Sequence, residues 1–172
     1  MPAGTFDTNA FLETSFSGNL DTTYVLPPED DYTAQITDRL TFRSGRIEKG
    51  DRAGQTWATA DLQWELLDDT LKQTLNLDRV LVRQSLMLDL LPDSTPDSPR
   101  LDFGTNKNMR LKRLLDATGL NSKKSWNFGM FKFATATVHV EHRKPEGFDD
   151  FMAEVTRVAP MGQAASSKKK VA

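Results

Sequence analysis

Alternation of apolar and polar residues from Tyr32 to Arg43 predicts a β-strand with one face in a core. The apolar positions of this run are Tyr32, Ala34, Ile36, Leu40 and Phe42. A period of two over this length is typical of a half-buried strand in an antiparallel sheet. The pattern returns over residues 57–66, where Trp64 falls on the apolar face and Trp57 on the polar one. Trp64 is therefore expected in the core and Trp57 outside it.

Three more strands follow along the chain. Arg79–Leu90 carries apolar residues in both registers, so it is either a central strand or a bulged one. Phe131–Arg143 alternates again, with Ala136 and Val138 among its inward positions, and Phe151–Val158 is the fifth expected strand.

Two helices interrupt these strands. Asn106–Leu120 has an apolar stripe on one side and basic residues on the other, with Gly119 where a C-terminal cap belongs. A shorter helix is expected over Asp68–Leu75. Five strands with the main helix between the third and the fourth predict a mainly β fold, an OB-like small antiparallel barrel. Other small barrels and half-barrels have the same order of elements and stay open as alternatives.

The chain divides into three parts. Residues 1–26 are expected to form an N-terminal arm with a short helix near Phe6–Leu12, and residues 27–160 the OB-like barrel domain. Residues 161–172 are small and polar and end in Lys168–Lys170, which predicts a disordered basic tail.

Composition excludes several classes of protein. The chain has no Cys and only 2 His, so a disulfide scaffold, a Cys-ligated metal site and a thiol nucleophile are excluded. No apolar run approaches the roughly 20 residues that span a bilayer, and the first residues do not resemble a signal peptide. We therefore expect a cytoplasmic protein without a membrane partner.

The net charge of −2 conceals an uneven distribution. Residues 1–99 carry −9, residues 100–144 carry +7 and residues 145–172 are neutral. A local positive field attracts phosphate whatever the total charge, which favours a surface that faces a polyanion. The alternative is that the two halves neutralise each other across their contact.

Catalysis has little support in the sequence. His139 and His142 are three residues apart on an expected strand and so point to opposite faces, which prevents them from chelating one metal ion unless a bulge lies between them. The carboxylates of Glu29–Asp31 and Asp68–Asp69 flank turns, where Asp commonly makes local hydrogen bonds. No phosphate-binding loop or nucleophile motif is present. We predict no enzyme activity, no cofactor and no metal.

Binding of single-stranded nucleic acid fits the sequence better. It requires a basic groove for the backbone and exposed aromatic rings for the bases. Trp57 and Phe133 are the expected stacking platforms on the outer faces of the strands. The expected cations are Arg39, Arg43, Arg83, Lys107, Arg110, Arg113, Lys123, Lys124, Lys132 and Arg143. Each residue alone also has an ordinary structural explanation, and only their combination favours the hypothesis.

Several segments resemble a set of uncharacterised bacteriophage proteins. They are Phe6–Leu12, Leu26–Glu29 before Tyr32–Ala34, Leu62–Trp64, Asn106–Gly119 with its ending Leu-Leu-Asp-Ala-Thr-Gly, and Ala136–Arg143. The set is similar in turn to phage single-stranded-DNA-binding proteins of replication and recombination modules, which have an OB-type fold. This chain departs from the pattern at Asp30, where the set usually has Gly.

The resemblance implies an accessory protein in the cytoplasm of the host cell that coats single-stranded DNA and cooperates with phage replication or recombination proteins. The alternative is a structural or adaptor protein that docks on a virion, replication or host-defence complex. A third hypothesis is a barrel that sequesters a small ligand or nucleotide. Exposed strand edges also make a homo-oligomer plausible.

Overall fold

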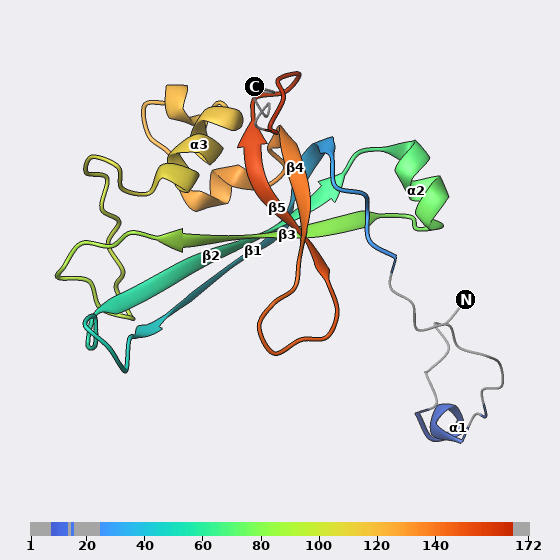
Figure 1. Cartoon of the computed structure of the whole chain (residues 1–172), viewed down its shortest axis with the longest axis horizontal. Coiled ribbons are helices and arrows are strands. Elements are labelled where there is room, and N and C mark those ends of the chain that lie inside the picture. The colour runs from blue at the N-terminus through green and yellow to red at the C-terminus, as the bar shows by residue number, and fades with distance from the viewer. Residues whose placement is uncertain (1–7, 14, 16–24, 167–172) are drawn as a thin grey trace, which may run out of the picture.

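The computed structural model describes residues 8–13, 15 and 25–166, in which five strands form one sheet that closes into a ring (Figure 1). The strands are β1 (Asp31–Arg46), β2 (Thr56–Leu66), β3 (Val80–Leu88), β4 (Thr135–Arg143) and β5 (Met152–Ala159). Their order around the ring is β1-β2-β3-β5-β4, with β4 returning to β1. The predicted mainly β class is confirmed.

The sheet is mixed, whereas a purely antiparallel one was predicted. Four neighbouring pairs are antiparallel, but β3 and β5 run parallel and meet at Arg83 and Glu154. A ring with an odd number of strands cannot alternate direction throughout, so one neighbouring pair must be parallel. Because this contact is so short, β3 and β5 diverge on either side of it.

The interior of the ring matches the predicted inward faces. Trp64 is fully buried, as expected, together with Ala60, Leu62 and Leu66. Of the two alternatives for the third strand, the structure shows the central one: β3 lies between β2 and β5, and it pairs with β2 over its whole length without a bulge. Val82 and Leu86 are buried, whereas Met87 is 65% exposed. One polar side chain, Gln84, lies among the inward residues of β3 and is only 2% exposed.

A bulge bends β1 just after the segment that pairs with both β2 and β4. Between Ile36 and Leu40 three residues of β1 face the single residue Gln63 of β2. Such a bulge bends the strand and increases its twist, which suits a strand that pairs with β4 over Asp31–Gln35 and with β2 over most of its length. Thr37 in the bulge is buried and bonds to Oε1 of Gln63 at 3.2 Å, although the alternation predicted it on the outer face.

The helices are shorter than the sequence predicted. They are α1 (Thr8–Leu12), α2 (Asp69–Leu75) and α3 (Met109–Ala117), with 3-10 turns η1 (Leu120–Ser122) and η2 (Phe128–Phe131). The expected helix over Asn106–Leu120 loses its first residues because Asn108 has a left-handed conformation with φ of 49°. The fourth strand likewise starts only at Thr135, since η2 occupies the residues before it.

Asn108 attaches the start of α3 to the end of β3. Its side-chain Nδ2 donates to the carbonyls of Asp89 and Asp102, and its Oδ1 accepts from the Asp89 backbone N–H at 2.9 Å. The helix then buries Leu111, Leu114, Leu115 and Ala117. Figure 1 shows α3 on one side of β3 and the β4–β5 loop on the other.

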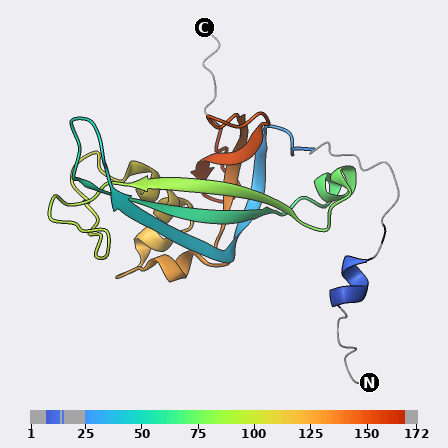
Figure 2. The same cartoon turned by 90° about the horizontal axis from the view of Figure 1, so that it is seen from below.

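The β1–β2 hairpin is the longest feature of the sheet. Figure 2 shows it extending well past the ends of β4 and β5.

None of the helices within the described residues has the length and apolar character needed to cross a membrane.

The chain after β5 returns to the start of β1. The backbone N–H of Ala165 donates to Oδ2 of Asp31 at 2.9 Å, and that of Ser166 to Oδ1 at 3.0 Å. Two residues of the predicted tail, Ala165 and Ser166, are thus held by hydrogen bonds. Residues 1–7, 14 and 16–24 of the predicted arm, and residues 167–172 of the predicted tail, lie outside the described residues.

Candidate nucleic-acid interface

The outer face of β1, β2 and β3 carries a shallow groove of about 340 Å³. Its lining residues are Arg39, Thr41, Asp61, Leu62, Gln63, Leu81, Val82 and Arg83. Arg39 is the last residue of the β1 bulge, and Arg83 comes from β3, so the two cations belong to the outer two of the three strands. Neither forms an ion pair with another residue in the described part of the chain.

Asp61 binds the third arginine of this face. Nε of Arg43 donates to Oδ2 of Asp61 at 2.7 Å, and a second guanidinium nitrogen donates to Oδ1 at 3.2 Å. Burial alone would raise the pKa of Asp61, but the hydrogen bonds from Arg43 and Ser85 and the charges of Arg43 and Arg83 outweigh it and lower that pKa. Asp61 therefore remains an anion at neutral pH and partly neutralises the groove.

The two predicted stacking platforms lie far apart. Trp57 is half-buried near the far end of the hairpin, where its ring lies over its cross-strand partner Gly45. Phe133 is 63% exposed and lies beside Ile36, whose carbonyl accepts its backbone N–H at 2.8 Å. Ile36 faces Trp64, seven residues along β2 from Trp57, which corresponds to about 23 Å of strand. The two rings therefore do not form one continuous stacking surface.

The conformation of Phe133 keeps its ring outside. Its φ of 63° is left-handed, which is uncommon for a bulky residue, and Nε2 of Gln35 donates to its carbonyl at 3.0 Å. The alternation had placed Phe133 in the fourth strand. It lies instead in the turn that joins η2 to β4.

The predicted cations around α3 form a second group. Arg110 and Arg113 line a pocket between α3, β3 and β5, and Arg143 lies close enough to Arg110 to affect its pKa. The remaining predicted cations are exposed in the segments before and after the helix and line neither this pocket nor the groove: they are Lys107, Lys123, Lys124 and Lys132. The structure thus divides the predicted basic surface into a groove, a pocket and scattered lysines.

Several exposed apolar side chains were not predicted as part of a site. Leu81 and Met87 lie on the outer face of β3, and Phe148 and Phe151 lie in the β4–β5 loop at 64% and 55% exposure. The apolar residues in both registers of the third strand were the available signal for Leu81 and Met87. No periodic pattern marks the two phenylalanines, because they lie in a loop.

The two histidines have separate partners. Nδ1 of His139 lies 2.7 Å from Oδ1 of Asp31, while Nε2 of His142 lies 2.7 Å from the carbonyl oxygen of Pro27. The carboxylate of Glu29 accepts the His142 backbone N–H, and Asp68 caps α2. Among residues 8–13, 15 and 25–166 no cluster of three or more His, Asp or Glu side chains is arranged to hold a metal ion.

No protein-family model matches this chain, and no curated protein matches it either.

Proposed function

We propose that this protein binds single-stranded DNA without sequence preference along the groove of β1, β2 and β3, and has no chemistry of its own. The observation that carries the proposal is the pair Arg39 and Arg83, two cations without ion-pair partners among the described residues, on the outer strands of a groove lined by both polar and apolar side chains. Such a groove neutralises a phosphate backbone, while Thr41 and Gln63 offer hydrogen bonds that do not select one base.

The order of the elements supports the same proposal. A ring ordered β1-β2-β3-β5-β4 with a helix between β3 and β4 matches an OB-type barrel, a fold in which strands 2 and 3 present the binding face for oligonucleotides. The groove lies over this pair of strands together with β1. Trp57 at the end of the hairpin and Leu81 on β3 add flat or apolar surface for bases. These side chains lose little conformational entropy when a base packs against them.

The experiment is a salt series of binding to labelled single-stranded and double-stranded oligonucleotides. We expect tighter binding to the single strand and an affinity that falls with salt, because each neutralised phosphate contributes about −0.7 to the slope of log K against log salt. Arg39→Gln and Arg83→Gln should each weaken binding and reduce that slope, whereas Arg46→Gln, an exposed cation outside the groove, should leave both nearly unchanged.

Absence of single-strand binding at low salt would overturn the proposal, because low salt is the most favourable condition for it. A stoichiometric protein partner captured without nucleic acid would then support the structural or adaptor alternative.

A further inference from the structure

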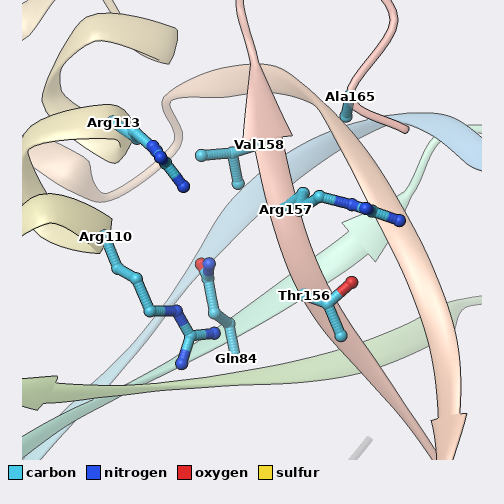
Figure 3. A pocket seen from close by; sticks show the side chains of 7 residues that line it. All are labelled: Gln84, Arg110, Arg113, Thr156, Arg157, Val158 and Ala165. Atoms are coloured by element: carbon cyan, nitrogen blue, oxygen red, sulfur yellow. The ribbon is translucent and has the colours of Figure 1, made fainter. Parts of the chain in front are cut away.

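A second, separate pocket lies where β3 and β5 diverge beneath α3. It has a volume of about 190 Å³, and its lining includes Gln84, Arg110, Arg113, Thr156, Val158 and Ala165. We call it the α3 pocket. Figure 3 shows Arg110 and Arg113 reaching from the helix toward the strands, and Gln84 reaching up from β3. Arg157 also lines it but points toward β4, where it bonds to Glu141 at 2.8 Å.

The pocket offers hydrogen-bond donors with few acceptors. Arg110 and Arg113 are three residues apart and so share one face of α3. Within the described residues neither guanidinium forms an ion pair or a hydrogen bond. No Asp or Glu is among the residues that line the pocket.

Gln84 adds a third donor. Nε1 of Trp64 donates to Oε1 of Gln84 at 2.9 Å, and an indole N–H can only donate. The amide oxygen of Gln84 is therefore fixed toward Trp64, which leaves its NH₂ group for the pocket.

Arg110 and Arg113 are both exposed residues, so solvent still reaches part of each side chain, but their like charges repel each other across the pocket. Burial and the nearby charge of Arg143 lower the pKa of Arg110, and Glu154 only partly opposes this effect. Arginine nevertheless stays protonated in proteins, so Arg110 keeps its positive charge in spite of charge repulsion and lost hydration. A bound anion would offset the repulsion and replace part of the lost hydration.

We propose that the α3 pocket binds a phosphoryl group. Guanidinium groups form paired hydrogen bonds with phosphate oxygens, and the neighbouring amide NH₂ supplies a further donor. The pocket is smaller than the roughly 300 to 1,000 Å³ of pockets for drug-sized ligands, and no aromatic ring lines it, so a phosphate fits it better than a nucleobase. The group comes either from a free phosphate or from a nucleic-acid strand.

The first experiment is titration of the full-length protein with inorganic phosphate, followed by calorimetry and by the shift in thermal unfolding. We expect saturable binding that Arg110→Gln and Arg113→Gln each weaken by about tenfold or more, with Arg46→Gln unchanged as the matched control. Arg110→Lys keeps the positive charge but lacks the planar guanidinium group. Its affinity for phosphate should therefore lie between that of the natural protein and that of Arg110→Gln. If phosphate binds no more tightly to the natural protein than to both glutamine variants, and all are folded by circular dichroism, the proposal is wrong.

The second experiment identifies the source of the phosphate. Oligonucleotides of one sequence are compared with a 5′-phosphate, a 3′-phosphate or hydroxyls at both ends. Tighter binding of one phosphorylated end, lost in Arg113→Gln, supports a site for a strand terminus. If the three oligonucleotides bind equally and Arg113→Gln weakens all of them, the site holds an internal phosphate of the strand. If only inorganic phosphate binds at this site, the ligand is a free phosphate.

This site is independent of the groove, so the two proposals fail separately. Arg39→Gln and Arg83→Gln should retain the affinity for inorganic phosphate. Phosphate binding without any single-strand binding would overturn the proposed function and leave the phosphoryl site intact. Single-strand binding with no phosphate titration would overturn the phosphoryl site alone.

Discussion

Nε1 of Trp64 donates a hydrogen bond of 2.9 Å to Oε1 of Gln84, and both side chains are almost completely buried in the ring. This bond joins the largest core side chain to the residue that faces the α3 pocket. It therefore connects the packing of β2 and β3 with the proposed phosphoryl site.

Replacing Gln84 by Leu should destabilise the protein by about 1 to 3 kcal/mol, because it leaves the buried Trp64 N–H without an acceptor. Urea unfolding monitored by circular dichroism measures this change. Trp64→Phe removes the same donor, so Gln84→Leu should cost clearly less in that background. An equal cost in both backgrounds would show that the bond does not contribute.

Asp31→Asn should weaken the attachment of the chain end and change the pH dependence of stability. Burial alone would raise the pKa of Asp31, but hydrogen bonds from the Ser166 backbone and from His139 outweigh it and place that pKa below its ordinary value of 3.8. A lowered pKa in the folded state contributes stability above pH 3.8, and this contribution is lost as the pH falls through the folded value.

We therefore expect the variant to be less stable at neutral pH by about 1 to 2 kcal/mol, and this difference to shrink in acid. The free energies of unfolding of the natural protein and of Asp31→Asn are compared at each pH. This comparison is needed because the pKa values of Asp61 and Glu65 are also lowered, and these two residues change the stability of both proteins in the same direction. A difference that is the same at pH 7 and well below pH 3.8 would contradict this role of Asp31.

Gly45→Ala should displace the ring of Trp57. A Cβ at this position would lie 2.9 to 3.0 Å from three atoms of the indole, closer than packed atoms tolerate. We expect a red-shifted tryptophan emission and a loss of about 1 kcal/mol of stability, typical of a mild overpacking. The same substitution in a Trp57→Phe background should give no emission shift, and a shift there would mean that another tryptophan is responsible.

Asn108→Ala should loosen α3 more than Asn108→Gly does. Both substitutions remove the hydrogen bonds to Asp89 and Asp102, each of which is worth about 1 kcal/mol, but only alanine is also penalised for the left-handed φ of 49°. Thermal unfolding should rank the natural protein first, glycine second and alanine last. Glycine and alanine variants of equal stability would show that the backbone conformation carries no cost.

Asp61→Asn should strengthen binding of single-stranded DNA if the groove is the binding face. The substitution removes a negative charge from the groove and releases Arg43 from its ion pair. At low salt we expect affinity to rise about fivefold, equivalent to roughly 1 kcal/mol for one charge pair in water. Fluorescence anisotropy measures the change, and Glu65→Gln, which removes a charge from an ion pair with Arg79, serves as the control.

Alternation along the strands was sufficient to predict most of the fold. Trp64, Leu62 and Ala60 are buried as expected, and the main helix lies between β3 and β4. These features depend on local periodicity, which the order of residues contains directly. The ends of α3 and β4 were less well predicted, because the left-handed residues Asn108 and Phe133 depend on hydrogen bonds to distant segments.

The candidate site was predicted only in its residue types. Arg110 and Arg113 were chosen for their charge, but their pocket exists because β3 and β5 diverge from a single parallel contact. Gln84 was missed, although a polar residue at an inward position of an apolar strand was a visible signal. Trp57 and Phe133 were grouped because both fall on outer faces, and a shared face does not imply proximity when strands are this long.

The amino-acid sequence by itself determined most of the buried face of each strand, the order of the strands and the two longer helices along the chain, and that positive charge concentrates in residues 100–144. These are properties of neighbouring residues and of solvation. Only the tertiary structure decided that Arg39 and Arg83 share one groove, and that Asp61 in this groove pairs with Arg43. It also decided that Arg110 and Arg113 line a second pocket together with Gln84. These relationships arise from the β1 bulge and the closure of the ring, which bring together residues from widely separated positions in the chain.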